Sequence, residues 1–189
     1  MRIIAGEAKG RRLKSVKGRG TRPTLARARA ALFDILSGQV PGSRFLDLFA
    51  GVGTVGLEAL SRGAGQVVFV ESDTRACDAI RINLCSLGLQ EQGRVIRGPV
   101  EQALCALGRR GETFDLVFLD PPYAEAAAAE RALEEIARSG VLEKDGTVVL
   151  QHSARAAPRE QAGALRRVRS HRAGDTCLTF YKMDAKAWE

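Results

Sequence analysis

The sequence predicts an α/β fold, with a Rossmann-like, doubly wound and mostly parallel sheet that ends in an antiparallel hairpin. Short apolar runs alternate with stretches of helical periodicity between residues 44 and 151, which is the pattern of successive βα units. A glycine-rich turn follows the first apolar run, as in the first half of a βαβ unit. Two strand-like runs near the end flank Ala173-Gly174-Asp175 and predict the hairpin.

The limits of the expected elements follow from turn residues and apolar spacing. Gly88 closes one helix, and the consecutive prolines Pro121 and Pro122 stop the strand before them. An Ala-, Glu- and Leu-rich composition favours a helix after these prolines. The expected strands are residues 44–49, 66–71, 94–97, 114–119, 147–151, 165–171 and 176–182, and the expected helices are residues 57–64, 73–87, 100–107 and 124–138.

Residues 1–40 are expected to form a small basic extension, and residues 41–189 the main domain. Within the extension, Arg2–Gly6 and Arg12–Lys14 are expected to be two short strands around a glycine-rich turn. A helix then opens at Pro23 or just after it, with Thr21 or Thr24 as its N-cap. Its apolar side consists of Ala28, Leu32, Ile35 and Leu36.

The net charge of +7 is unevenly distributed. Residues 1–30 hold ten Lys or Arg and one acid, a charge of +9, so the other residues sum to 7 − 9 = −2. Such a concentration is typical of a surface that binds a polyanion, although a solvated basic face or a loose tail is the alternative. Six C-terminal arginines extend this surface or form a solvated strand face, namely Arg155, Arg159, Arg166, Arg167, Arg169 and Arg172.

Composition excludes several classes of protein. No apolar run approaches about 18 residues and no charged-then-apolar leader precedes the first strand, so we expect a cytoplasmic protein that is neither membrane-spanning nor secreted. The four cysteines (Cys77, Cys85, Cys105 and Cys177) show no C-x-x-C spacing. We expect them to be reduced small hydrophobes, with no metal site. His152 and His171 are expected to be ordinary polar residues, and Glu58 and Arg62 to pair on a helix surface or cap a neighbouring element.

The strand at residues 114–119 runs into Asp120-Pro121-Pro122-Tyr123. It therefore delivers a carboxylate, rigid backbone carbonyls and an aromatic ring to the carboxyl edge of the sheet, where ligands bind in open α/β folds. Carboxylate and carbonyl oxygens accept hydrogen bonds, and an aromatic face stacks on a planar ring. The group suits a flat heterocycle that carries an amino group.

The glycine turn Gly51-x-Gly53-x-x-Gly56 matches the nucleotide-binding fingerprint, and Glu71 falls where an acid that binds a ribose is expected. Such a turn serves NAD proteins and S-adenosylmethionine proteins alike, and some are only tight packing. Asp47 favours S-adenosylmethionine, because a carboxylate here repels a pyrophosphate and attracts an ammonium group. The Asp120–Tyr123 turn has no role in hydride transfer.

At these residues the chain resembles a known family. Asp47 through Gly53 is similar to motif I of class I S-adenosylmethionine-dependent methyltransferases, and Asp120–Tyr123 to their motif IV. The whole chain resembles the RsmD family, bacterial methyltransferases that act on a guanine N2 of 16S ribosomal RNA. The other matching segments are Arg2–Gly6 with Lys9–Arg11, Thr21–Thr24 with Arg27 and Arg29, Leu46–Gly51, Gly56–Ala64, Val70–Asp73 and Gly174–Thr176.

The resemblance implies site residues in three groups and no metal. The implied catalytic residues are Asp120, Pro121, Pro122 and Tyr123. The implied S-adenosylmethionine contacts are Asp47, Phe49, Ala50, Gly51, Gly53, Glu71, Ser72, Val100, Glu101 and Asp120. The implied RNA contacts are Lys9, Arg11, Arg12, Arg22, Thr24, Arg27 and Arg29. Two positions depart from the family, Ala30 in place of Glu, and Gly98-Pro99 where polar residues are common near the adenine.

The implied partner is 16S rRNA in the 30S subunit or an assembly intermediate, and the protein is expected to be a monomer. Two other functions stay open. An adenine-N6 or other base methyltransferase on DNA, tRNA or 23S rRNA shares every motif, but should carry a target-recognition insertion. A non-catalytic RNA-binding protein with a nucleotide pocket would not need Asp120 and Tyr123. An NAD oxidoreductase is disfavoured because no catalytic acid–base pair can be named.

Overall fold

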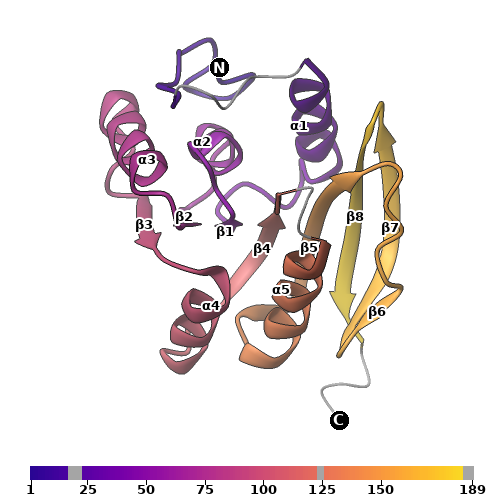
Figure 1. Cartoon of the computed structure of the whole chain (residues 1–189). Coiled ribbons are helices and arrows are strands. Elements are labelled where there is room, and N and C mark those ends of the chain that lie inside the picture. Colours follow the sequence, from indigo (N-terminus) through magenta and orange to yellow (C-terminus); the bar gives the residue numbers. More distant parts are fainter. Residues whose placement is uncertain (17–22, 123–125, 185–189) are drawn as a thin grey trace.

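The computed structural model describes residues 1–16, 23–122 and 126–184. These residues form one sheet of eight strands in the order β3-β2-β1-β4-β5-β8-β7-β6, with parallel pairing through β5 and antiparallel pairing beyond it (Figure 1). The predicted α/β class is therefore confirmed. The strands are β1 Arg44–Leu48, β2 Gln66–Glu71, β3 Gly93–Arg97, β4 Phe114–Leu119, β5 Leu142–Ser153, β6 Gln161–Ala162, β7 Leu165–Ala173 and β8 Thr176–Met183.

Helices cover both faces of the sheet. They are α1 Pro23–Ile35, α2 Thr54–Ser61, α3 Thr74–Leu87, α4 Val100–Arg109 and α5 Ala126–Ser139. The α4 and α5 helices pack on one face, in a cluster that includes Leu104 and Leu133. The α1, α2 and α3 helices pack on the other face, in a cluster that includes Phe33, Leu57 and Ile80. None of the described helices is long and apolar enough to cross a membrane.

The strand order reverses between β1 and β4, since the chain proceeds outward from β1 through β2 and β3 and then returns to β4. Ligands bind in the crevice that this reversal opens at the carboxyl ends of the strands. Asp47, near the end of β1, is in register with Phe118 of β4. The fold therefore brings the glycine turn and the Asp120 turn to the same edge.

The N-terminal segment (residues 1–16) lies across α2, between α1 and α3 (Figure 1). The two strands expected here are reduced to one isolated bridge between Arg2 and Arg12. Hydrogen bonds from the Ile3 amide to the Arg11 carbonyl and from the Leu13 amide to the Met1 carbonyl flank this bridge, so the predicted hairpin is present but shorter than expected. The pairing ends there because the backbone amides of Ile4 and Ala5 donate to the Glu58 carboxylate, at 2.8 and 2.9 Å. Ile3 and Leu13 belong to the same hydrophobic cluster as α2. Whether the chain divides at residue 40 stays a prediction.

Other differences from the expected elements are small. The fifth strand begins earlier than expected, and β6 was not foreseen because two residues are too few for a periodic pattern. The four cysteines are free thiols, and Cys77 is buried as expected of a small hydrophobe, but Cys85 is exposed on α3.

Candidate active site

Three carboxylates gather at the carboxyl ends of the central strands. Asp47 comes from β1, Glu71 ends β2, and Asp120 follows β4. Asp47 is almost fully buried and accepts a hydrogen bond from the Gly56 amide at 2.9 Å, which ties β1 to the first turn of α2. Burial raises the pKa of Asp47 well above its ordinary value, and the charges of Asp120 and Glu71 raise it further. The site is thus preorganised for a cation.

Glu71 holds the glycine turn in place. Its carboxylate accepts hydrogen bonds from the Gly51 amide at 2.7 Å and from the Ser72 and Asp73 amides at 2.9 Å. Gly51 and Gly53 have φ values of 57° and 78°, which explains why glycine is required at both positions. Phe49 also has a positive φ, of 58°, and such strain in a bulky residue is typical of functional sites.

A hollow of about 200 Å³ lies beside this turn, between the ends of β2 and β3 and the N-terminal parts of α4 and α5. It is lined by Phe49, Glu71, Ser72, Gly98, Pro99, Val100, Glu101, Ala128 and Arg131. Five of the ten residues implied for the cofactor meet here. Gly98 and Pro99, where this chain differs from the family, are part of the wall of this hollow. The Arg131 guanidinium donates a hydrogen bond to the Glu101 carboxylate at 3.2 Å, and both residues line the hollow.

Asp120 directly precedes Pro121, which lines a second hollow. Burial raises its pKa to about 6, against the opposing effect of a hydrogen bond with the Gln151 side chain. Gln151 was not among the predicted site residues, because in the sequence it is only the last residue of the strand expected at 147–151. Pro121 is buried, Pro122 is exposed, and Tyr123 lies outside the described residues.

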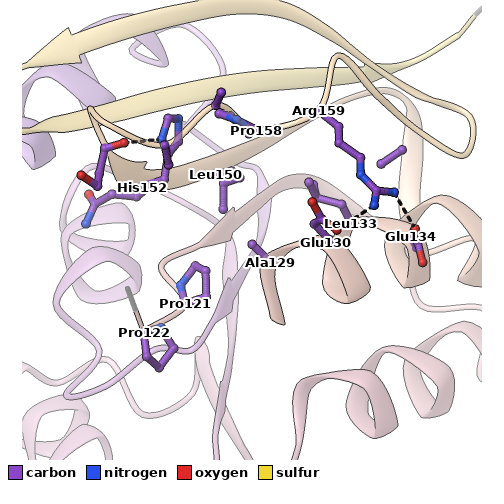
Figure 2. Close-up of a pocket in the computed structure, with 15 residues that line it drawn as sticks. Pro121, Pro122, Ala129, Glu130, Leu133, Glu134, Leu150, His152, Pro158 and Arg159 are labelled. Carbon is purple, nitrogen blue, oxygen red and sulfur yellow. Dashed lines mark hydrogen bonds and ion pairs between the residues drawn. The ribbon is translucent and has the colours of Figure 1, made fainter. Parts of the chain in front are cut away.

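The second hollow, of about 320 Å³, opens beside Pro121 and Pro122 between α5 and the end of β5 (Figure 2). Its walls are mostly apolar and include Leu133, Leu150 and Pro158. Arg159 forms ion pairs with Glu130 and Glu134 at 2.8 and 3.3 Å, visible at one side of Figure 2. At the proline end lies His152, whose ring bonds the Ser153 carbonyl and the Thr179 hydroxyl at 2.8 Å. Burial lowers the pKa of His152, so the ring is neutral at pH 7.

The residues implied for RNA binding are not all available at the surface. Lys9, Arg11, Arg12 and Arg27 are exposed, and Arg11 also bonds the Ser86 carbonyl at 2.5 Å. Arg22 and the side chain of Thr24 lie outside the described part of the chain. The N-terminal segment therefore presents its basic side chains to solvent while its backbone bonds the helices below.

The structure contradicts the predicted role of Arg29 in RNA binding. We predicted that it contacts RNA, but it is only 8% exposed, donates to the Arg2 carbonyl at 2.8 Å and lies 3.7 Å from the Glu58 carboxylate. Arg62 also bonds Glu58, at 2.9 Å, and Glu58 is fully buried. The Glu58–Arg62 pair is therefore internal, and Glu58 caps the N-terminal segment, which was the second of its two expected roles. A helix periodicity cannot reveal the capping role, because the Ile4 and Ala5 amides that donate to Glu58 lie over 50 residues away in the sequence.

Five of the six C-terminal arginines fall into two sets by the contacts of their guanidinium groups. Three form ion pairs, Arg159 as above, Arg166 with Asp184 at 3.1 Å, and Arg167 with Glu160. The Arg169 guanidinium lies over the Phe180 ring, and Arg172 bonds the Gly174 carbonyl. Much of this charge is compensated locally, which favours the alternative of a solvated strand face. In the described ranges no group of three His, Cys, Asp or Glu side chains is arranged to hold a metal ion.

Residues 1–182 match the model of a protein family described as "Conserved hypothetical protein 95". The chain belongs to this family. Relatives of this chain are named "Ribosomal RNA small subunit methyltransferase D", and the resemblance to the RsmD family is confirmed. The one from Haemophilus influenzae is 32% identical over 80% of this chain and 78% of its own.

Other relatives of the RsmD family match nearly end to end. YlbH of Bacillus subtilis, named as a candidate rRNA methyltransferase, is 39% identical over 96% of this chain and 98% of its own. The solved structure of YhhF from Escherichia coli, titled a candidate methyltransferase, has a TM-score of 0.82 at 28% identity and covers 98% of both chains. The fold is thus that of class I methyltransferases, and this family member is a methyltransferase.

Proposed function

We propose that the protein transfers a methyl group from S-adenosylmethionine to the exocyclic N2 of a guanine in 16S rRNA, within the small ribosomal subunit or an assembly intermediate. It acts in this proposal as a cytoplasmic monomer. The observation that carries the proposal is the Asp120-Pro121 turn, which stands at the switch point of a chain that matches the RsmD family end to end. The relatives named small subunit methyltransferase D support rRNA as the substrate.

The residues fit the proposed cofactor, which supplies a methyl group on a positively charged sulfur. The charges of Glu71 and Asp120 both act on the buried Asp47 carboxylate, and a cation beside these groups relieves that repulsion. In our assignment Glu71 accepts the ribose hydroxyls, while Phe49 and Val100 flank the adenine. The turn Ala50–Gly53 holds the amino-acid tail, and Ser72 and Glu101 complete the polar wall.

Asp120 and Pro121 provide the proposed chemistry. The lone pair of guanine N2 is delocalised into the ring, which makes the amine a poor nucleophile. If the Asp120 carboxylate and the Pro121 carbonyl accept its two N–H groups, they turn the lone pair toward the methyl group and stabilise the positive charge that develops on nitrogen. The N–C bond forms as the C–S bond breaks, and the methylated amine then loses a proton to Asp120 or water. Positioning of this kind supplies about 7–11 kcal/mol.

We place the target base against Pro121 and Pro122, at the mouth of the 320 Å³ hollow. Tyr123 stacks on it in this proposal, a contact that contributes about 1–3 kcal/mol. Gln151 and His152 line the same end of the hollow. Both ring nitrogens of the neutral His152 are already bonded within the protein, so in this proposal the ring packs beside the base, and Gln151 orients the Asp120 carboxylate. The RNA backbone follows the basic N-terminal segment and Arg27 in this proposal, and Arg22 and Thr24 are further proposed contacts.

The nature of the substrate is tested by transfer of tritiated methyl groups onto 30S subunits, assembly intermediates, naked 16S rRNA, tRNA and DNA. Digestion of the labelled product then identifies the modified nucleoside. We expect N2-methylguanosine in 16S rRNA, with a particle preferred over naked RNA. N6-methyladenosine, or label in DNA or tRNA alone, would establish the alternative base methyltransferase, and no label in any substrate would favour a non-catalytic binding protein.

The contribution of the basic surface is tested by its salt dependence. We expect the triple variant Lys9→Ala, Arg12→Ala, Arg27→Ala to weaken 30S binding, and to reduce the slope of log Kd against log salt by about 2–3, since each lost phosphate contact removes about one counterion. The matched control replaces Arg109, Arg110 and Lys144, which are exposed and lie at the opposite edge of the sheet. Equal slopes for both triple variants would reject the assignment.

A further inference from the structure

Asn83 is a buried amide that joins three parts of the chain. It lies in α3 and is only 1% exposed. Its Oδ1 accepts a hydrogen bond from the Lys14 amide at 2.7 Å. Its Nδ2 donates hydrogen bonds to the Lys14 carbonyl at 3.2 Å and to the Val52 carbonyl at 3.3 Å. A carboxamide has two donor hydrogens and an acceptor oxygen, so all three contacts are satisfied together. Aspartate or leucine in its place would lose both donated bonds.

One end of this junction is the basic N-terminal segment. Asn83 bonds both backbone polar groups of Lys14, as a neighbouring strand would, while the Lys14 side chain is exposed. The Leu13 amide bonds the Met1 carbonyl at 3.0 Å and the Ile3 amide bonds the Arg11 carbonyl at 3.1 Å. The segment is therefore cross-linked within itself, and a shift at Lys14 is transmitted to Arg11 and Arg12.

The other end is the glycine turn. Val52 lies between Gly51 and Gly53, whose left-handed conformations fix the turn, and the Gly51 amide bonds Glu71. A ligand that approaches Gly51 or engages Glu71 must act on this turn, and the Val52 carbonyl is part of it. One side-chain amide group thus lies between the proposed cofactor contacts and the proposed RNA contacts.

We propose that Asn83 is a positioning residue that couples the cofactor turn to the basic segment, so that cofactor and RNA strengthen one another's binding. The inference rests on the function proposed above, because it requires both ligands. Such coupling is reciprocal, so a cofactor that tightens RNA binding is itself bound more tightly in the presence of RNA by the same factor. Measured couplings of this kind typically range from about 5-fold to 150-fold.

The test is a thermodynamic cycle on the full chain. The Kd for 30S subunits is measured with and without saturating S-adenosylhomocysteine, which binds without turnover, for the wild type, Asn83→Leu, Asn83→Asp and the control Cys85→Ser. Cys85 is exposed on the same helix. The ratio of the Kd without S-adenosylhomocysteine to the Kd with it measures the coupling. We expect this ratio to be about 5 or more for the wild type and the control, and about 1 for both Asn83 variants. The Kd of each variant for S-adenosylhomocysteine alone should stay within about threefold of the wild type.

Hydrogen exchange of the wild type provides a readout that needs no variant. The Lys14 amide donates a hydrogen bond to Asn83. S-adenosylhomocysteine should slow the exchange of this amide by about 5-fold or more. A wild-type ratio of 1, an unchanged ratio in folded Asn83→Leu, or an unaffected Lys14 amide would each overturn the inference. If methyl transfer to 30S subunits is intact in that case, the proposed function stands. If 30S subunits are neither bound nor methylated, both fail.

Discussion

Asp120→Ala is expected to lower kcat for methyl transfer by at least about 100-fold, the effect of removing one preorganised group that stabilises developing charge. The Kd for S-adenosylmethionine should change by less than about threefold, because Asp47 and Glu71 remain. Asp120→Asn keeps an oxygen that accepts one N–H bond, so we expect an intermediate loss of about 10-fold. The rates come from single-turnover transfer to the substrate that the tritium assay identifies, and a wild-type rate for Asp120→Ala would refute the assignment.

The raised pKa of Asp120 predicts how activity depends on pH. Only the ionised Asp120 carboxylate can accept a hydrogen bond from the guanine amine and later take up its proton. We therefore expect kcat/KM to rise with pH and to reach a plateau above about 6, the pKa of Asp120 in the free enzyme. The Asp120→Asn variant lacks this group and should show no such rise between pH 5 and pH 7. A wild-type profile that is flat across this range would contradict the role of the carboxylate.

The same pKa predicts that Asp120 costs stability. Its folded-state value of about 6 lies above the ordinary 3.8, so protonation favours the fold, and stability is lost as pH rises from about 4 to about 6. The difference corresponds to at most about 3 kcal/mol, and partial exposure reduces it. Asp120→Asn should therefore be more stable than the wild type by about 1–3 kcal/mol at pH 7.5, and equally stable below pH 4. Urea unfolding at both pH values measures this.

The sequence could predict the parts of the site that depend on neighbouring residues. Gly51 and Gly53 signal a left-handed turn, and Pro121 ends a strand whose apolar residues fix its place in a parallel sheet. The carboxyl ends of parallel strands lie at one edge of the sheet, so the sequence predicts that Asp47, Glu71 and Asp120 lie near one another. The hollow that we assign to the cofactor lies at this same edge, lined by Glu71 and Phe49.

The sequence could not predict the contacts that tie the N-terminal segment to the helices. Glu58 and Asn83 resemble ordinary polar residues on amphipathic helices, and their partners at Ile4 and Lys14 are backbone groups, which carry no signal in the side-chain pattern. Arg29 was misassigned for the same reason. Its charge resembles that of Arg27, but the turn of α1 points it toward Glu58 and into the protein. Local charge predicts a polyanion surface, whereas burial decides which arginines belong to it.

Glu58→Ala is expected to destabilise the protein by about 3–5 kcal/mol, the cost of leaving a buried partner of an ion pair uncompensated. The Glu58 carboxylate is fully buried and accepts the Ile4 and Ala5 amides and the Arg62 guanidinium, with Arg29 at 3.7 Å. Its loss strands two amides and two cations at once. Glu58→Gln, which keeps one acceptor and removes the charge, should lose less, about 1–3 kcal/mol.

The control for Glu58 is Asp78→Ala, which removes the exposed Arg81–Asp78 pair on α3 and should cost at most about 1 kcal/mol. Urea unfolding at pH 7.5 gives the free energies. Hydrogen exchange under native conditions should show loss of protection at Ile4 and Ala5 in Glu58→Ala while the amides of β1 and β4 keep theirs, because the segment detaches before the sheet unfolds. A loss below 1 kcal/mol, or unchanged exchange at Ile4 and Ala5, would mean that the hydrophobic contacts of Ile3 and Leu13 hold the segment without this carboxylate.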